Sequence, residues 1–164
     1  MTPSETRPEP CTRRAGPADA AALVVLRGVM FEAMGSLGAA DANWRDAARA
    51  WFERELAGPH TCVMVAEDEH GLVVSSAMGR LRREAPSPTN PAGVSGAVSN
   101  VVTLPGARGR GLARACLGTL LEWFDEETEA GQLELFATGD GAGLYESVGF
   151  RVTAWPAMRM RLRR

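Results

Sequence analysis

The stretch that decides the fold is residues 101–124, which read VVTLPGARGRGLARACLGTLLEWF. The apolar, β-branched run at its start predicts a buried strand over 98–104. A Pro-Gly turn follows, and apolar residues at helical spacing then predict a helix over about 109–128. The first turn of a helix offers unpaired N–H groups and the positive end of the helix dipole. Gly109 and Gly111 carry no side chains that would block a ligand, and arginines stand beside them, so the junction predicts a phosphate or pyrophosphate site.

Two other interpretations of this junction stay open. An ordinary strand–turn–helix connection with a solvated run of arginines would have the same glycine spacing. A dinucleotide-binding oxidoreductase is disfavoured, because G-x-G-x-x-G needs a third glycine where Arg114 stands. The acidic residue that would contact a ribose about 20 positions on has candidates only in the run Asp125-Glu126-Glu127.

Outside this stretch, the hydrophobic pattern predicts a mixed α/β domain. No internal repeat or domain boundary is visible, so we expect one domain over 11–164, after a polar, proline-rich tail over 1–10 that is predicted to be disordered. Arginines alternate with Met158, Met160 and Leu162, which favours a final edge strand. The predicted elements are a strand over 11–14, helices over 19–34 and 43–57, strands over 61–67 and 71–83, a loop over 84–97, the strand over 98–104, the helix over 109–128, a strand over 132–137, a helix over 141–148 and a strand over 150–163.

Composition narrows the classes of function. The chain has 164 residues and a formal net charge of -2, so the whole chain is not built to bind nucleic acid. All 18 basic residues are arginine, which excludes a Walker A loop, pyridoxal-phosphate chemistry and a protein kinase, because each requires a lysine. Three separated cysteines and two histidines show no metal-ligand spacing, so no metal is expected. The free cysteines and the lack of a signal peptide or membrane span predict a cytoplasmic protein without a membrane partner.

Two motifs carry a resemblance to a known family. Arg108-x-x-Gly111-x-Ala113, after a strand ending in V-x-L-P, is similar to the R/Q-x-x-G-x-G/A acyl-CoA motif of the GNAT superfamily of N-acetyltransferases. The segment LYESVGF, residues 144–150, resembles the L-Y-x-x-x-G-F segment of the same superfamily. The resemblance covers roughly residues 11–163 and implies a GNAT-like single α/β domain (mixed α+β). Its central sheet would be mixed and mostly antiparallel, with a splayed pair of strands, and about four helices would flank it.

The resemblance implies acetyl-CoA as cosubstrate. The backbone amides from Gly109 to Arg114 would hold the pyrophosphate, and the pantetheine arm would pair with the motif strand. A free N–H near Val102 would polarise the acetyl carbonyl and steady the oxyanion. The cofactor-binding residues implied in this way are Val101, Val102, Thr103, Arg108, Gly109, Arg110, Gly111, Leu112, Ala113 and Arg114.

The resemblance also implies direct transfer of the acetyl group to an amine. Tyr145, the only tyrosine, matches the family position that protonates the departing thiolate, although it could be a core aromatic. Glu134 matches a position where some members place the general base, and Glu32 could instead reach the acceptor; each could also be a surface carboxylate. Asn100 is a polar residue inside an apolar strand, so it serves either the active site or the structure.

The first two helices of this fold wall the acceptor pocket, so Phe31 and Met34 join Glu32 as predicted substrate-binding residues. Many members carry an Asn before the Tyr-bearing helix, where this chain has Thr138 and Asp140. The sequence thus predicts a cytoplasmic, acetyl-CoA-dependent N-acetyltransferase acting on a primary amine of a small molecule or peptide. A homodimer is common in the family. The alternative is a non-catalytic acyl-CoA-binding or regulatory module.

Overall fold

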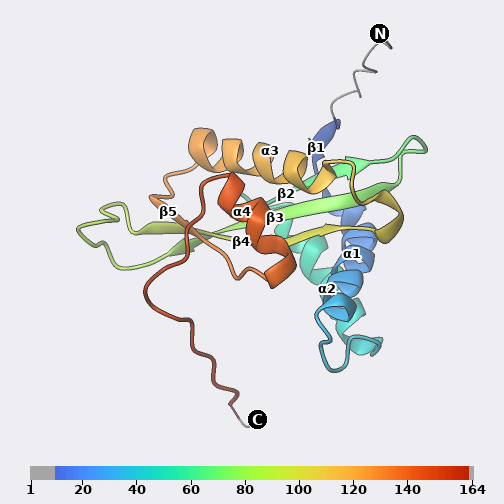
Figure 1. Ribbon diagram of the computed structural model, residues 1–164, viewed down its shortest axis with the longest axis horizontal. Helices are drawn as coiled ribbons and strands as arrows, with labels where there is room; N and C mark the ends of the chain where they lie inside the picture. The colour runs from blue at the N-terminus through green and yellow to red at the C-terminus, as the bar shows by residue number, and fades with distance from the viewer. Residues whose placement is uncertain (1–9, 163–164) are drawn as a thin grey trace.

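A five-stranded sheet forms the centre of the molecule (Figure 1). The computed structural model describes residues 10–162. The strands lie in sequence order, and neighbouring strands are antiparallel except for the parallel pair β4 and β5. The strands are β1 (Thr12–Arg14), β2 (Thr61–Glu67), β3 (Val73–Arg83), β4 (Val94–Thr103) and β5 (Gln132–Glu134), and the helices are α1 (Ala20–Ala33), α2 (Asn43–Glu55), α3 (Leu112–Glu127) and α4 (Ala142–Ser147).

Helices cover both faces of this sheet (Figure 1). α3 and α4 pack on one face, and α1 and α2 pack on the other, so the domain has two apolar cores. Strand β2 serves both, because successive side chains of a strand point to opposite faces. Cys62 and Met64 belong to the core under α3, whereas Val63 and Val65 belong to the core under α1. The predicted architecture, a mixed and mostly antiparallel sheet flanked by about four helices, is confirmed.

A bulge in β4 opens the sheet at its centre. In the pairing of β3 with β4, Ser76 lies opposite Val102 and Met78 lies opposite Ser99, so Ala77 faces two residues of β4. One of these two, Asn100, has a φ of 50°, the left-handed conformation that Asn tolerates better than most residues. On its other side, β4 pairs with β5 only from Ser95 to Ala97. The edge of β4 beyond Ala97 is therefore open, as the predicted splayed pair of strands requires.

Two predicted boundaries shift for identifiable reasons. β4 begins at Val94, inside the predicted loop over 84–97, because Gly96 allows Phe124 and Leu133 to pack closely over the strand. α3 begins at Leu112 rather than near residue 109, because Gly109 and Gly111 both have positive φ and keep the preceding residues in a loop.

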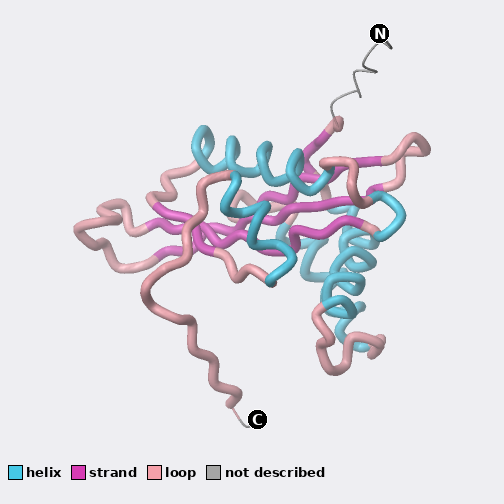
Figure 2. The backbone as a smooth tube through the Cα atoms, viewed as in Figure 1, coloured by secondary structure: helices cyan, strands magenta, loops and turns pink. Residues whose placement is uncertain are grey.

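The predicted strand over 150–163 is wrong for the residues that the structure describes. Residues 150–162 contain no strand, and the segment leaves the sheet as a loop (Figure 2). The alternating apolar residues are exposed; Met158, for example, is 95% exposed. Period-2 alternation specifies a strand only where a neighbouring edge pairs with it, and β5 offers only three residues. Arg163 and almost all of the predicted tail over 1–10 lie outside the described residues.

Candidate active site

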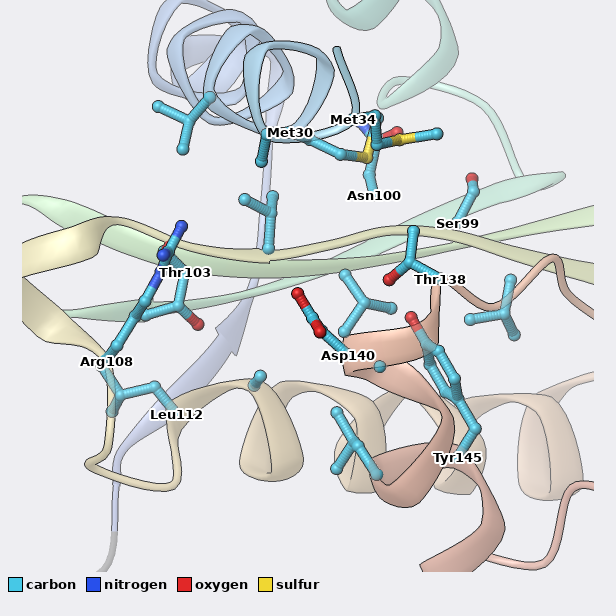
Figure 3. Close-up of a pocket in the computed structure, with 18 of the residues that line it drawn as sticks. Met30, Met34, Ser99, Asn100, Thr103, Arg108, Leu112, Thr138, Asp140 and Tyr145 are labelled. Carbon is cyan, nitrogen blue, oxygen red and sulfur yellow. The ribbon is translucent and has the colours of Figure 1, made fainter.

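A cavity of about 810 Å³, which we call the β4 groove, lies along the open edge of β4. Residues from the end of α1, from β4, from the loop before α3 and from α4 line it (Figure 3). The groove thus brings together segments that are more than 100 residues apart in the sequence. It collects nine of the ten predicted cofactor-binding residues: Val101, Val102, Thr103, Arg108, Gly109, Gly111, Leu112, Ala113 and Arg114. Arg110 is exposed and does not line the groove.

One end of the groove is the N-terminus of α3. Gly111 precedes the helix with a φ of 78°, and no side chain caps it. A Cβ atom at Gly109 or Gly111 would meet no heavy atom within 4 Å, so a ligand has room to approach the backbone. The first N–H bonded within the helix is that of Ala115, which donates to the carbonyl of Gly111 at 3.0 Å. The preceding amides therefore point toward the groove end with the positive end of the helix dipole, which suits a phosphate.

The floor of the groove is the unpaired edge of β4. Leu104 donates its N–H to the carbonyl of Val74 in β3 at 2.8 Å. Because backbone direction alternates along a strand, the N–H of Val102 also faces β3, whereas those of Val101 and Thr103 face the open edge. The carbonyl of Thr103 accepts a hydrogen bond from Arg108 Nε at 3.2 Å, which fixes that arginine beside the strand. The free donors along this edge thus belong to Val101 and Thr103.

Tyr145 projects from α4 into the groove, on the same side as Thr138 and Asp140 (Figure 3). Its ring packs edge-on against Phe150, with 6.2 Å between ring centroids. Its hydroxyl donates to no residue in the described part of the chain. Burial raises the pKa of this hydroxyl above its ordinary value of 10, because it disfavours the phenolate. Tyr145 is therefore a protonated donor at neutral pH with its hydroxyl free for a ligand.

Asn100 is 5% exposed and lines the groove at the bulge. Its Oδ1 accepts a hydrogen bond of 2.6 Å from Nη1 of Arg27 in α1, and its backbone carbonyl accepts one of 3.0 Å from the hydroxyl of Ser76. Arg27 also stacks over the ring of Phe31, with 4.6 Å from its Cζ to the ring centroid. Sequence reasoning missed Arg27, although an arginine within the apolar run AALVVLRGVMF was a usable signal.

The two predicted base candidates lie outside the groove. Glu32 is exposed and lies 3.6 Å from Nη2 of Arg45, and it lines neither large cavity. Glu134 lines a neighbouring cavity of about 410 Å³, which we call the side cavity, and its Oε2 lies 3.8 Å from Nη1 of Arg82. Phe31 and Met34 do line the groove. The groove thus collects four further predicted site residues: Phe31, Met34, Asn100 and Tyr145. Glu134 lies in the adjoining cavity, and Glu32 lies in neither.

The buried thiols are unsuited to nucleophilic chemistry. Burial raises the pKa of Cys62 and the pKa of Cys116 to about 11 each, so both are neutral thiols at neutral pH. No group of three or more His, Cys, Asp or Glu side chains among residues 10–162 is placed to hold a metal ion. Within the same residues, no helix is both long and apolar enough to cross a membrane.

Comparison with known proteins identifies a matching family and several solved structures with a similar fold. Residues 59–152 match the family model of the acetyltransferase (GNAT) domain. No curated protein matches the chain. A predicted acetyltransferase from Clostridium acetobutylicum, solved with acetyl-CoA, has a TM-score of 0.79 and 24% identity over 91% of this chain and 95% of its own. A GCN5-related N-acetyltransferase from Ralstonia eutropha has a TM-score of 0.79 and 23% identity over 92% and 97%. An acetyltransferase from Trypanosoma brucei has a TM-score of 0.64 and 25% identity over 93% and 99%.

Proposed function

The chain belongs to the GNAT acetyltransferase family, and on this premise we propose that it binds acetyl-CoA in the β4 groove and transfers the acetyl group directly to a primary amine. One observation carries the proposal: the groove joins an uncapped helix N-terminus, a free strand edge and the unpartnered hydroxyl of Tyr145. These three features fit the diphosphate, the amide-containing arm and the thioester end of acetyl-CoA in that order. The family match favours this activity over a non-catalytic module and over a dinucleotide-binding oxidoreductase.

The binding half of the site follows from backbone donors. The N–H groups of Leu112, Ala113 and Arg114 hold the diphosphate, with the guanidinium of Arg108 beside them. The open edge of β4 at Val101 and Thr103 pairs with the amides of the arm, as an added strand would. Asp140 and Thr138 line the opposite wall, where many family members carry an Asn, and we assign them the remaining polar contacts.

The reactive half centres on Val101 and Tyr145. A backbone N–H at the bulge, which the strand direction assigns to Val101, donates to the thioester carbonyl oxygen as that oxygen gains negative charge. The C–S bond breaks as the amine nitrogen bonds to the acetyl carbon, and the hydroxyl of Tyr145 donates its proton to the departing sulfur. No acyl-enzyme forms, which agrees with the neutral, buried thiols.

The amine must lose a proton as it attacks. We assign this role to Glu134, acting through water, because Glu134 lines the cavity that adjoins the groove whereas Glu32 lines neither. The acceptor is thus a small molecule or peptide amine that enters from the side cavity. Location in the cytoplasm, a homodimer and a single domain over 11–164 stay predictions of the sequence.

Thermal melting with acetyl-CoA, CoA, NAD and ATP in parallel tests the proposal. A ligand at about 100 times its Kd stabilises the folded state by about 2.7 kcal/mol. In a domain of this size that raises the Tm by roughly 5–10 °C. We expect this shift with acetyl-CoA and CoA alone, followed by thiol release in the presence of an amine. Folded protein whose Tm ignores both CoA species would contradict the proposal.

A further inference from the structure

The side cavity has an excess of positive charge that acetyl transfer itself does not use. It lies against the α1 and α2 face of the sheet, bounded by β3, β4 and the end of β5. Three guanidinium groups line it, those of Arg27, Arg80 and Arg82, and the only carboxylate among its lining residues is that of Glu134. Its charge at neutral pH therefore favours an anion.

Arg27 is the deepest of the three arginines. It is partly buried, and the only hydrogen bond of its guanidinium within residues 10–162 goes to the neutral oxygen of Asn100. Burial lowers the pKa of its guanidinium, because no carboxylate compensates for the lost water. A guanidinium has five N–H donors, so most of those on Arg27 lack a protein acceptor. A buried cation in this state is stabilised by an incoming anion.

The other two arginines differ in their pairing. Arg80 stacks over the indole of Trp51, with 5.0 Å from its Cζ to the ring centroid, and forms no salt bridge in the described part of the chain. Arg82 lies 3.8 Å from Glu134, and both side chains of this pair are at least half exposed, so their attraction is weak. Arg27 and Arg80 therefore keep free guanidinium donors.

Apart from Ser99, the remaining lining residues of the cavity are apolar. Phe52 and Met78 line it from the buried core, and Trp51 and Phe136 line it as well, with Phe136 71% exposed. Val98 and Ser99 line both this cavity and the β4 groove, as does Phe136. A molecule held in the side cavity can therefore extend an amine into the groove beside Tyr145.

We propose that the acceptor is a primary amine that carries an anionic group, a carboxylate or a phosphate, on an apolar body, and that Arg27 and Arg80 bind this anion in the side cavity. The proposal deepens the proposed function and rests on it. The guanidinium fork matches the oxygen pairs of both anions. Both guanidinium groups stack on aromatic rings, Arg27 on Phe31 and Arg80 on Trp51, and these contacts hold them at the cavity.

Matched acceptor pairs test the proposal and separate the two anions. L-phenylalanine is compared with L-phenylalanine amide, and O-phosphoethanolamine with ethanolamine, by thiol release from acetyl-CoA. We expect the anionic member of at least one pair to have a kcat/KM at least about tenfold higher, the effect of one charged hydrogen bond. The pair that shows the preference identifies the anion. Equal or better use of both neutral members would overturn the proposal.

A matched pair of variants locates the effect. Arg80→Gln removes one free guanidinium, and Arg83→Gln removes an exposed guanidinium at the end of the same strand that lines neither cavity. We expect Arg80→Gln to lower kcat/KM about tenfold more for the anionic acceptor than for its neutral partner, whereas Arg83→Gln changes neither. An equal loss for both acceptors in Arg80→Gln would overturn the assignment.

A binding experiment tests the anion site even if no amine of the panel is acetylated. N-acetyl-L-phenylalanine and inorganic phosphate are titrated calorimetrically into the protein saturated with CoA. Binding of either one that weakens about tenfold in Arg80→Gln supports the proposal, and binding of neither overturns it. Failure of the proposed function gives a different result, because acetyl-CoA would then not raise the Tm.

Discussion

The β4 groove and the side cavity share three lining residues but are built in different ways. The wall of the groove that we propose to bind acetyl-CoA comes largely from one continuous stretch, residues 98–114, with Tyr145 added from α4. The side cavity takes its charged residues from α1, β3 and β5, separated by long stretches of sequence. The hydrogen-bond donors of the groove are largely backbone amides, which any sequence can supply. Those of the side cavity are the side chains of particular residues. Under the proposed function, the half of the site that binds acetyl-CoA is therefore local in the sequence, and the half that selects an acceptor is assembled by the fold.

The largest effect should come from Tyr145→Phe, which tests the reactive end of the groove. The ring and its contact with Phe150 are kept, and only the hydroxyl is lost. We expect kcat to fall at least about 100-fold, because proton transfer to the departing sulfur loses its donor. The KM for acetyl-CoA should stay within about twofold, because the backbone donors that bind it are unchanged. A variant with full kcat would show that Tyr145 is only a core aromatic.

The pH dependence of the wild-type rate tests the same role of Tyr145. In the proposed mechanism Tyr145 acts in its protonated form, and burial raises its pKa above 10. The activity that depends on its proton is therefore present below pH 10 and is lost only as the pH rises through the raised value. Steady-state rates should show little loss from this group up to pH 9, provided that the folded fraction is followed by circular dichroism. An alkaline limb below pH 9 that Tyr145→Phe abolishes would contradict the direction of this shift.

Asn100 lies where the two cavities meet, and two substitutions separate its conformation from its side chain. Asn100→Gly and Asn100→Val both leave Arg27 without its acceptor, which costs about 1.5–3 kcal/mol for a bond to a charged group. Only valine also strains the backbone at a φ of 50°, which adds about 1–3 kcal/mol. Urea unfolding should therefore rank wild type above Asn100→Gly and Asn100→Gly above Asn100→Val. Equal midpoints for the two variants would mean that the bulge relaxes.

The carboxylates of the acceptor side should show a smaller effect. Glu134→Gln is expected to lower kcat about tenfold, because water can still accept part of the amine proton. Glu32→Gln is the matched control, since Glu32 is exposed and lines neither cavity. If Glu32→Gln alone lowers the rate, the base lies on α1 and the acceptor enters from the side of that helix rather than from the side cavity.

The same contrast explains what the sequence could predict. The strand, the glycine loop and the helix after it are adjacent in the chain, so Gly109, Gly111 and Leu112 were identifiable from local pattern alone. The partnership of Arg27 with Asn100 spans 73 positions and depends on how α1 packs on the sheet, which no local pattern encodes. The side cavity was missed for the same reason. The C-terminal alternation was misleading in the opposite way, because a strand requires an edge as well as a pattern.

Substitutions in the exposed C-terminal segment should have the smallest effect on stability. They test whether its alternating residues pair with a strand edge. Met158 and Met160 are 95% and 80% exposed, so the double variant Met158→Ser/Met160→Ser should change the free energy of unfolding by no more than about 0.5 kcal/mol. Leu120→Ala, at a fully buried position on the side of α3 that packs on the sheet, should cost about 2–5 kcal/mol in the same urea titration. If the serine variant loses more than about 1 kcal/mol, the alternating residues pair with an edge in solution, and β5 is the nearest candidate. If the free energy of unfolding of the wild type also rises with protein concentration, that edge belongs to a second copy of the chain. Only association makes stability depend on protein concentration.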